Sequence, residues 1–393
     1  MNELDARILP PDDPQRRTLH NEVHARPSAR VRLPALITYV ALLNAGVSRE
    51  QECVHLQRLP GHGGLGLDRL QGNFLRLRCD GYTVKWERHT EFTRYSIVQP
   101  LPAHAGWGST LPELASHVAT GTEWLRGLPG QTVAAIHLAM LPEGMDDPNM
   151  LVRAQQWLGE GMLIGSRMGN TVEGRSHSCL LSHLRIGTDG FERLLVLASP
   201  ETTEGRGGRI SQRVLELETY RLMALRGLPV AKQLSPVLAQ AESQLADITA
   251  RLEGQQGGDQ ALLDALVALA ARVERATAEH GYRFSATRAY DAVVRERIRE
   301  LRERPLHGTQ TVGEFMQRRL SPAIATVEAT AQRLGALSER VSRTSALLRT
   351  RVDIATEAQN QQLLEKLTRG QDLQLRLQST VEGLSIAAIS YYV

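Results

Sequence analysis

The strongest constraint in this sequence is a long heptad-like stretch in its C-terminal part. Between about residues 311 and 382, apolar or small residues recur at spacings of three and four, with one irregularity around Leu334–Leu337. Thr311 and Glu314 have the spacing of a capping box, which predicts that a helix begins there. One helix over this stretch would be on the order of 100 Å long. No compact domain buries such a helix, so it must form a stalk, a helical hairpin or an oligomer interface.

The composition of the chain changes near residue 205. All four tryptophans and ten of the twelve histidines precede this position, whereas the remainder is rich in Leu, Ala, Arg, Glu and Gln, a helix-forming composition. Two further helical blocks are expected at 209–252 and 259–304. The sequence therefore predicts an N-terminal α+β domain over residues 1–205. Long antiparallel helices, forming a coiled-coil-like stalk or hairpin, are expected over residues 206–383.

Short apolar runs bounded by Gly, Asp and Pro indicate strands in the N-terminal part. Ser48 with Gln51, and Thr110 with Glu113, have capping-box spacing and predict two helices among these strands. Since the strands and helices mix without regular β–α–β spacing, the class is α+β. The expected strand regions are 83–100 (one or two strands), 131–141, 161–169, 176–186 and 191–199.

Bulk properties exclude several classes of protein. A length of 393 residues predicts two or three domains, and 42% hydrophobic with 23% charged residues excludes wholesale disorder. A net charge of +3 gives no reason to expect nucleic acid as a partner. Cys53, Cys79 and Cys179 are far apart and form no Cys-x-x-Cys, which favours a reducing compartment without a structural zinc site. The first residues lack the apolar segment of a secretory signal, so we expect the soluble part in the cytoplasm.

The last ten residues, 384–393, carry no charge. Ten apolar residues are too few to cross a bilayer, which needs about 17–25. Tyr391 and Tyr392 stand where an aromatic pair could lie at a membrane interface. The segment is either a helix end that packs on the core or the beginning of a transmembrane helix.

Five motifs carry a resemblance to a known family. They are HNEVHARP (20–27), WERHTEF (86–92), ELETYRLMAL (216–225), TRVDIATEAQNQQLL (350–364) and LQSTVEGLSIAAISYYV (377–393). With these motifs the chain resembles the bacterial family called domain of unknown function 3422, described as predicted membrane-anchored proteins. The resemblance implies a hydrophobic segment that continues beyond Val393, and hence a bacterial inner-membrane protein whose soluble part faces the cytoplasm. It implies no activity.

The order of an α/β domain, long helices and a C-terminal membrane segment is also similar to that of CorA-type magnesium channels. This likeness is one of architecture only, because the Gly-Met-Asn signature of those channels is absent from the 393 residues. It makes the soluble region of an ion channel or transporter an alternative function.

The densest group of metal-binding side chains is His20, Glu22 and His24. The spacing is not that of H-E-x-x-H, and on a helix Glu22 would point away from both histidines. In an extended segment side chains alternate, so all three would face the same way.

His89 and Glu91 form a second pair with the same spacing, on a segment expected to be a strand. If both segments converge, His20, Glu22, His24, His89 and Glu91 could hold a divalent metal or act as acid and base. The alternative is structural: these groups would pair with neighbouring arginines and fix the N-terminal arm.

We therefore expect a membrane-anchored cytoplasmic protein that acts as an oligomeric helical scaffold or sensor module. Its partners would be further copies of itself and the membrane at its C-terminus, with no nucleic acid and no ligand that the sequence identifies. No G-x-S-x-G or Walker motif is present, so the balance is against an enzyme. A metal-dependent enzyme built on the His/Glu cluster is the competing class.

Overall fold

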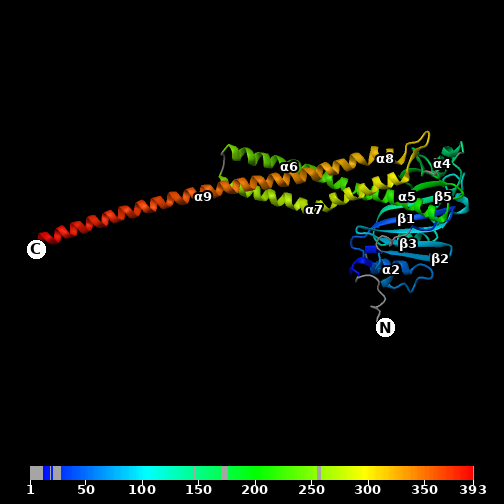
Figure 1. Cartoon of the computed structure of the whole chain (residues 1–393), viewed down its shortest axis with the longest axis horizontal. Coiled ribbons are helices and arrows are strands. Elements are labelled where there is room, and N and C mark those ends of the chain that lie inside the picture. Colours follow the sequence, from blue (N-terminus) through cyan, green and yellow to red (C-terminus); the bar gives the residue numbers. More distant parts are fainter. Residues whose placement is uncertain are drawn as a thin grey trace. The chain divides into compact units, whose positions relative to one another are not determined.

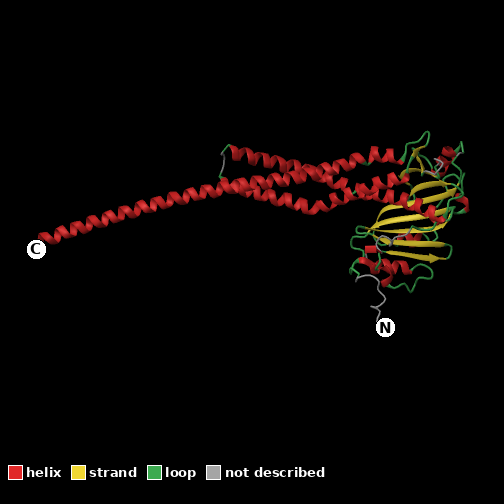
Figure 2. Ribbon diagram, viewed as in Figure 1, coloured by secondary structure: helices red, strands yellow, loops and turns green. Residues whose placement is uncertain are grey.

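The computed structural model describes residues 12–17, 19–20, 28–145, 147–169, 176–254 and 258–392. The chain divides into two compact units. The first contains Met1–Gly227 and Ala286–Ala325, and the second contains Leu228–Ser285 and Thr326–Val393. The first unit holds the sheet, and the second is built from long helices (Figure 2).

Nine strands form one sheet in the described part of the first unit, in the order β2-β3-β4-β1-β5-β8-β7-β6-β9. Neighbouring strands are antiparallel except β5 and β8, which run parallel. The sheet is therefore mixed, and the predicted α+β class is confirmed. The strands are β1 (Ala35–Leu43), β2 (Phe74–Cys79), β3 (Tyr82–Arg88), β4 (Phe92–Pro100), β5 (Gln131–Pro142), β6 (Ile164–Met168), β7 (Ser178–Ile186), β8 (Glu192–Ala198) and β9 (Arg304–Pro305).

Each predicted strand region contains a strand, and the region 83–100 forms two, β3 and β4. The sequence analysis missed β1 and β2, although β1 lies between β4 and β5 near the middle of the sheet. All but the last residue of β1 is buried, so its sequence is a continuous apolar run without the alternation that reveals a half-exposed strand.

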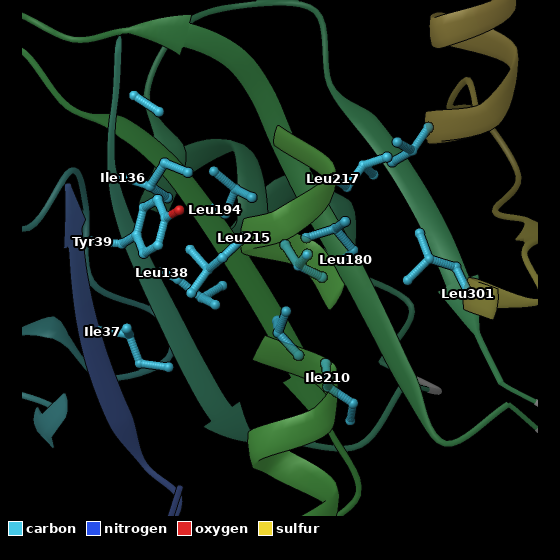
Figure 3. Close-up of a cluster of buried hydrophobic side chains, with 14 of the residues drawn as sticks. Ile37, Tyr39, Ile136, Leu138, Leu180, Leu194, Ile210, Leu215, Leu217 and Leu301 are labelled. Carbon is cyan, nitrogen blue, oxygen red and sulfur yellow. The ribbon is translucent and has the colours of Figure 1, made fainter. Parts of the chain in front are cut away.

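Both faces of β1 are covered. Ile37 and Tyr39 belong to the hydrophobic core that includes Leu215 of α5 (Glu204–Leu225), as Figure 3 shows. Val40 packs with Leu56 of α2 (Arg49–Gln57), and Leu36 packs on the side of α4 (Met150–Leu158). The sheet is therefore enclosed between α5 on one face and α2 and α4 on the other.

The predicted helix beginning at Thr110 is wrong. Leu111 precedes Pro112, a position at which helical backbone angles are disfavoured, and it has a φ of 39°. The segment instead forms the short helices η4 (Ala115–His117) and α3 (Thr122–Arg126), and another short helix, η3 (Ala103–Ala105), precedes it. In contrast, the capping boxes at Ser48 and Thr311 are both present, and they begin α2 and α8 (Val312–Arg319).

Two of the predicted helical blocks are divided. The block at 209–252 forms α5 and α6 (Gly227–Glu253), and the block at 311–382 forms α8 and α9 (Ser321–Tyr392). The block at 259–304 forms a single helix, α7 (Asp259–Leu301). Because α9 has 72 residues, its length is about 108 Å at the usual rise per residue.

The core of the second unit lies between α6, α7 and α9 (Figure 1), where buried residues recur at heptad-like spacing. Arg333 of α9 binds Glu242 of α6 (Nη2–Oε2 2.8 Å), and Arg351 donates to the carbonyl oxygen of Leu252 (2.9 Å). Since these contacts advance together along both helices, α9 runs parallel to α6 and antiparallel to α7. The buried α9 residues in this core are Val327, Leu334, Leu337, Val341 and Leu348.

No helix in the part of the chain that the structure describes is long and apolar enough to cross a membrane. The expected transmembrane segment at 384–393 is, as far as Tyr392, the end of α9.

A buried carboxyl group connects the sheet to α5. Glu192 of β8 lies beside Glu218 and Arg221, with 3.5 Å between Arg221 Nη2 and Glu192 Oε1. Burial, and then the neighbouring carboxylate of Glu218, raise the pKa of Glu192 from 4.5 to about 9. Arg221 lies closer to Glu218, with 2.8 Å between its Nε and Oε2 of that residue. Glu192 is therefore protonated at neutral pH in the folded protein.

This proton makes folding stability depend on pH. Between the pKa of the unfolded chain, 4.5, and about 9, only the folded state holds the proton on Glu192, so stability falls as the pH rises through this range. Glu192→Gln keeps a neutral side chain of the same shape, and it should gain stability relative to the unmodified protein on going from about pH 5 to about pH 8. Urea unfolding at both pH values measures this difference. A difference that does not change with pH would show that Glu192 is ionised in the fold.

Candidate functional site

A polar pocket of about 560 Å³ lies in the first unit, next to the hairpin that joins β3 and β4. Its volume is in the range of small-molecule sites. Side chains from α2, α5 and α7 complete its walls. The lining residues are Arg49, Asn73, Arg88, His89, Thr90, Phe92, Tyr220, Ala289, Tyr290 and Val293.

One wall of this pocket is aromatic. His89 stacks on Phe92 with 4.5 Å between ring centroids, and Phe92 meets Tyr220 edge to face at 6.1 Å. Tyr220 of α5 in turn stacks on Tyr290 of α7 at 5.7 Å, and the Tyr290 hydroxyl donates to Glu91 Oε2 at 2.7 Å. The rings therefore connect the hairpin to both helices.

The pocket is also lined by two arginines whose positions are fixed. Arg49 donates to the carbonyl oxygen of Leu70 and to the side chain of Asn73. Arg88 pairs with Glu52 of α2, with 2.8 Å between Nη1 and Oε2, and Glu52 has no exposed surface. Ordered guanidinium groups beside stacked rings suit a planar or anionic ligand better than a cation.

The structure places the predicted metal-binding residues differently from the sequence analysis. His89 and Glu91 do not lie on a strand but in the turn between β3 and β4, where the His89 amide donates to the Phe92 carbonyl oxygen at 2.8 Å. The strand alternation that was expected to align them therefore does not apply. His20 is exposed, whereas Glu22 and His24 lie outside the described residues.

The metal hypothesis stays a prediction. Among the residues that the structure describes, no three His, Cys, Asp or Glu side chains lie together as a cation site would require. His89 and Glu91 do reach the same pocket region, since Glu91 binds the pocket residue Tyr290.

The sequence analysis missed the helical residues of the pocket. Tyr220 belongs to the motif ELETYRLMAL, which was recognised by resemblance only, and Tyr290 lies in the expected helical block at 259–304. The signal that the sequence offered was a tyrosine in each of two predicted helices, Tyr220 and Tyr290. Their meeting with the hairpin depends on tertiary packing.

A second candidate surface is the part of α9 that follows Val352. α6 ends at Glu253 and α7 begins at Asp259, and Arg351 reaches the latter residue (Nε–Oδ2 3.1 Å). From residue 353 to 386 every side chain of α9 is exposed. Figure 1 shows α9 continuing past the ends of both helices that pack beside it in this unit.

The exposed part of α9 carries an apolar row, here called the α9 stripe. On a helix with about 100° per residue, its members fall within a sector of about 120° that includes the direction of the buried Leu348. After a gap from Val352 to Leu363, the row therefore lies in the same sector as the face that α9 buries against α6 and α7. The α9 stripe comprises Leu363, Leu367, Leu373, Leu377, Val381 and Leu384.

The family model described as "Protein of unknown function (DUF3422)" matches residues 11–393, so the chain belongs to this family. No curated protein and no solved structure matches the chain. The architectural likeness to CorA-type channels accordingly has no support. The family assigns no activity, so function has to be argued from the surfaces described above.

The Glu52–Arg88 pair makes a prediction about the pocket wall. Glu52→Gln leaves the Arg88 guanidinium without its buried counter-charge, and losing one partner of a buried pair costs about 3 kcal/mol or more. We expect a reduction in the free energy of unfolding of about 2–3 kcal/mol, because Arg88 is partly exposed.

Urea unfolding measures this reduction. The control is Glu123→Gln, which removes an exposed ion pair with Arg126 and should leave stability almost unchanged. Equal effects of the two substitutions would mean that Glu52 does not hold Arg88 in place.

Proposed function

We propose that this protein is an assembly scaffold, in which the α9 stripe pairs with the α9 stripe of a second copy of the chain. The observation that carries the proposal is the change of environment at Val352. The same sector of one helix is buried before this residue and exposed after it.

A lone helix does not explain the exposed part of α9. Isolated helices are marginally stable in water unless side-chain pairs support them. The stretch 353–386 offers only Glu365–Arg369 and Asp372–Arg376 at the i, i+4 spacing of acid and base. Within this described stretch the structure records no ion pair. Burial of the stripe by a partner helix would supply the missing stabilisation.

A second copy is the partner that continuity favours. The stripe extends an interface in which α9 already packs by heptad-like spacing against two helices. Leu363 to Leu384 spans about three heptads, the length at which a coiled coil becomes a reasonable expectation. The apolar residues on the opposite side of the helix are sparser, since Leu364, Leu375 and Ile386 stand eleven residues apart.

The proposal predicts different effects for two leucines of similar exposure. Leu377 (66% exposed) lies in the stripe, and Leu375 (63% exposed) lies on the opposite side of the helix. Leu377→Asp should dissociate the oligomer, because a carboxylate buried in the paired interface carries a penalty of several kcal/mol. Leu375→Asp should leave the mass in solution unchanged. Light scattering after size-exclusion chromatography measures both masses.

Leu348→Ala supplies a control for folding. Leu348 is fully buried within its own unit, so its truncation should lower the free energy of unfolding by about 2–5 kcal/mol without altering the oligomer. If Leu377→Asp and Leu375→Asp give the same mass as the unmodified chain, the stripe is not an interface between copies.

We also propose attachment to the bacterial inner membrane, with the two units in the cytoplasm. Support comes from the sequence alone, since residues 384–393, which begin with the last residue of the stripe, carry no charge. Arg369 and Arg376 precede this run, as basic residues do on the cytoplasmic side of membrane segments.

Fractionation of cells that produce the full-length protein tests this second proposal. The protein should sediment with membranes and require detergent for release. Recovery in the soluble fraction without detergent would refute attachment, and it would leave pairing of the α9 stripe unaffected.

A further inference from the structure

Three arginines gather around a second pocket of the first unit, of about 530 Å³. Arg30 and Arg32 lie in the segment before β1, and Arg78 lies near the end of β2. Among the described residues, no acidic side chain lines this pocket. Its lining residues are Arg30, Arg32, Leu33, Pro34, Arg78, Cys79, Gly81, Tyr82, Thr83, Val98, Gln99 and Pro100.

The backbone that carries Arg30 and Arg32 is held firmly against α5. The amide of Val31 donates to the Glu204 carbonyl oxygen at 3.1 Å, and Val31 is completely buried. A Cβ atom at Gly207 would lie 2.8 Å from the Val31 carbonyl oxygen, so only glycine permits this approach. Arg30 and Arg32 flank the buried Val31 and are both exposed. The side chains of Arg30 and Arg32 therefore project away from the core, from a backbone segment whose position is fixed.

Arg78 reaches the pocket from the edge strand. Its backbone is paired with Thr83 of β3, and its side chain is exposed. The three arginines thus come from two separate parts of the chain.

Some arginines of the same unit have acidic partners. Arg94 binds Glu87 (Nε–Oε2 2.6 Å), and Arg297 binds Glu216 (Nε–Oε2 2.7 Å). No carboxylate of the described chain lies within ion-pairing distance of Arg30, Arg32 or Arg78. Within the part of the chain that the structure describes, the three positive charges around this pocket are therefore uncompensated, and an anion between them would relieve their mutual repulsion.

The remaining lining residues add hydroxyl donors and an apolar floor. Burial, with the neighbouring Cys79, raises the pKa of Tyr82 to about 12, so its hydroxyl keeps a proton to donate. Thr83 offers a second hydroxyl, while Leu33 and Val98 supply apolar surface. Guanidinium groups bind phosphate oxygens in a bidentate manner, and the pocket is larger than one phosphate ion requires.

We propose that this pocket binds an organic phosphate, with the phosphate group between Arg30, Arg32 and Arg78 and the organic part on the apolar floor. The phosphate belongs either to a soluble ester or to a lipid headgroup. The site is separate from the α9 stripe, and its occupation does not depend on pairing of the chain.

Isothermal titration calorimetry of the full chain with inorganic pyrophosphate tests the soluble form of the ligand. We expect saturable binding that weakens about tenfold for each of Arg30→Gln, Arg32→Gln and Arg78→Gln, and that salt also weakens. Arg126→Gln is the matched control, because Arg126 is an exposed arginine outside the pocket. Thermal unfolding checks that each variant is folded.

Flotation with vesicles tests the lipid form of the ligand. The probes are vesicles of phosphatidylcholine alone and of equimolar phosphatidylcholine and phosphatidic acid. Binding to the second kind only, lost in the triple arginine variant but kept in Arg126→Gln, would assign the site to a headgroup. If neither pyrophosphate nor phosphatidic acid binds, or if folded triple variant and control bind equally, the proposal is wrong.

Discussion

An apolar row on a helix has to be covered by other side chains. In this protein, the apolar residues of α9 extend beyond α6 and α7, the helices that pack against it. α6 and α7 cover the row on α9 from Val327 to Leu348, where the buried residues keep heptad-like spacing. Apolar residues recur in the same sector from Leu363 to Leu384, where every side chain is exposed. Exposed apolar surface of this extent is unfavourable in water, which is why we propose a partner outside the chain.

The two pockets of the first unit illustrate how the same residue type serves different purposes. In the pocket beside the β3–β4 turn, Arg88 is neutralised by the fully buried Glu52, so it is a fixed wall within an aromatic site. In the pocket beside β2, no acidic side chain of the described residues lines the site with Arg30 and Arg78, which is why we propose that their charge binds an anion. We therefore distinguish a structural arginine from a proposed binding arginine by whether a buried carboxylate neutralises it, and not by the number of arginines around the pocket.

The sequence predicted the features that depend on local chemistry. The capping boxes at Ser48 and Thr311 and the long C-terminal helix follow from spacing alone, and five strand regions follow from their bounding turn residues. Features set by tertiary context were missed: β1 lacks alternation because both of its faces are buried. The local pattern at Thr110 was overridden by Pro112. His89 and Glu91 were predicted as a pair on a strand, but they lie in a turn, and Tyr290, which binds Glu91, is about two hundred residues away and could not be inferred without the fold.

Hydrogen exchange at residues 360–386 of the unmodified chain, measured over a range of protein concentrations, tests the central claim most directly. A paired α9 stripe predicts slow exchange of these amides, with protection that rises as the concentration of the protein increases. An unpaired helix in water opens readily, so its amides would exchange fast at every concentration. Fast exchange that is independent of concentration, beside slow exchange at residues 327–348, would contradict the account.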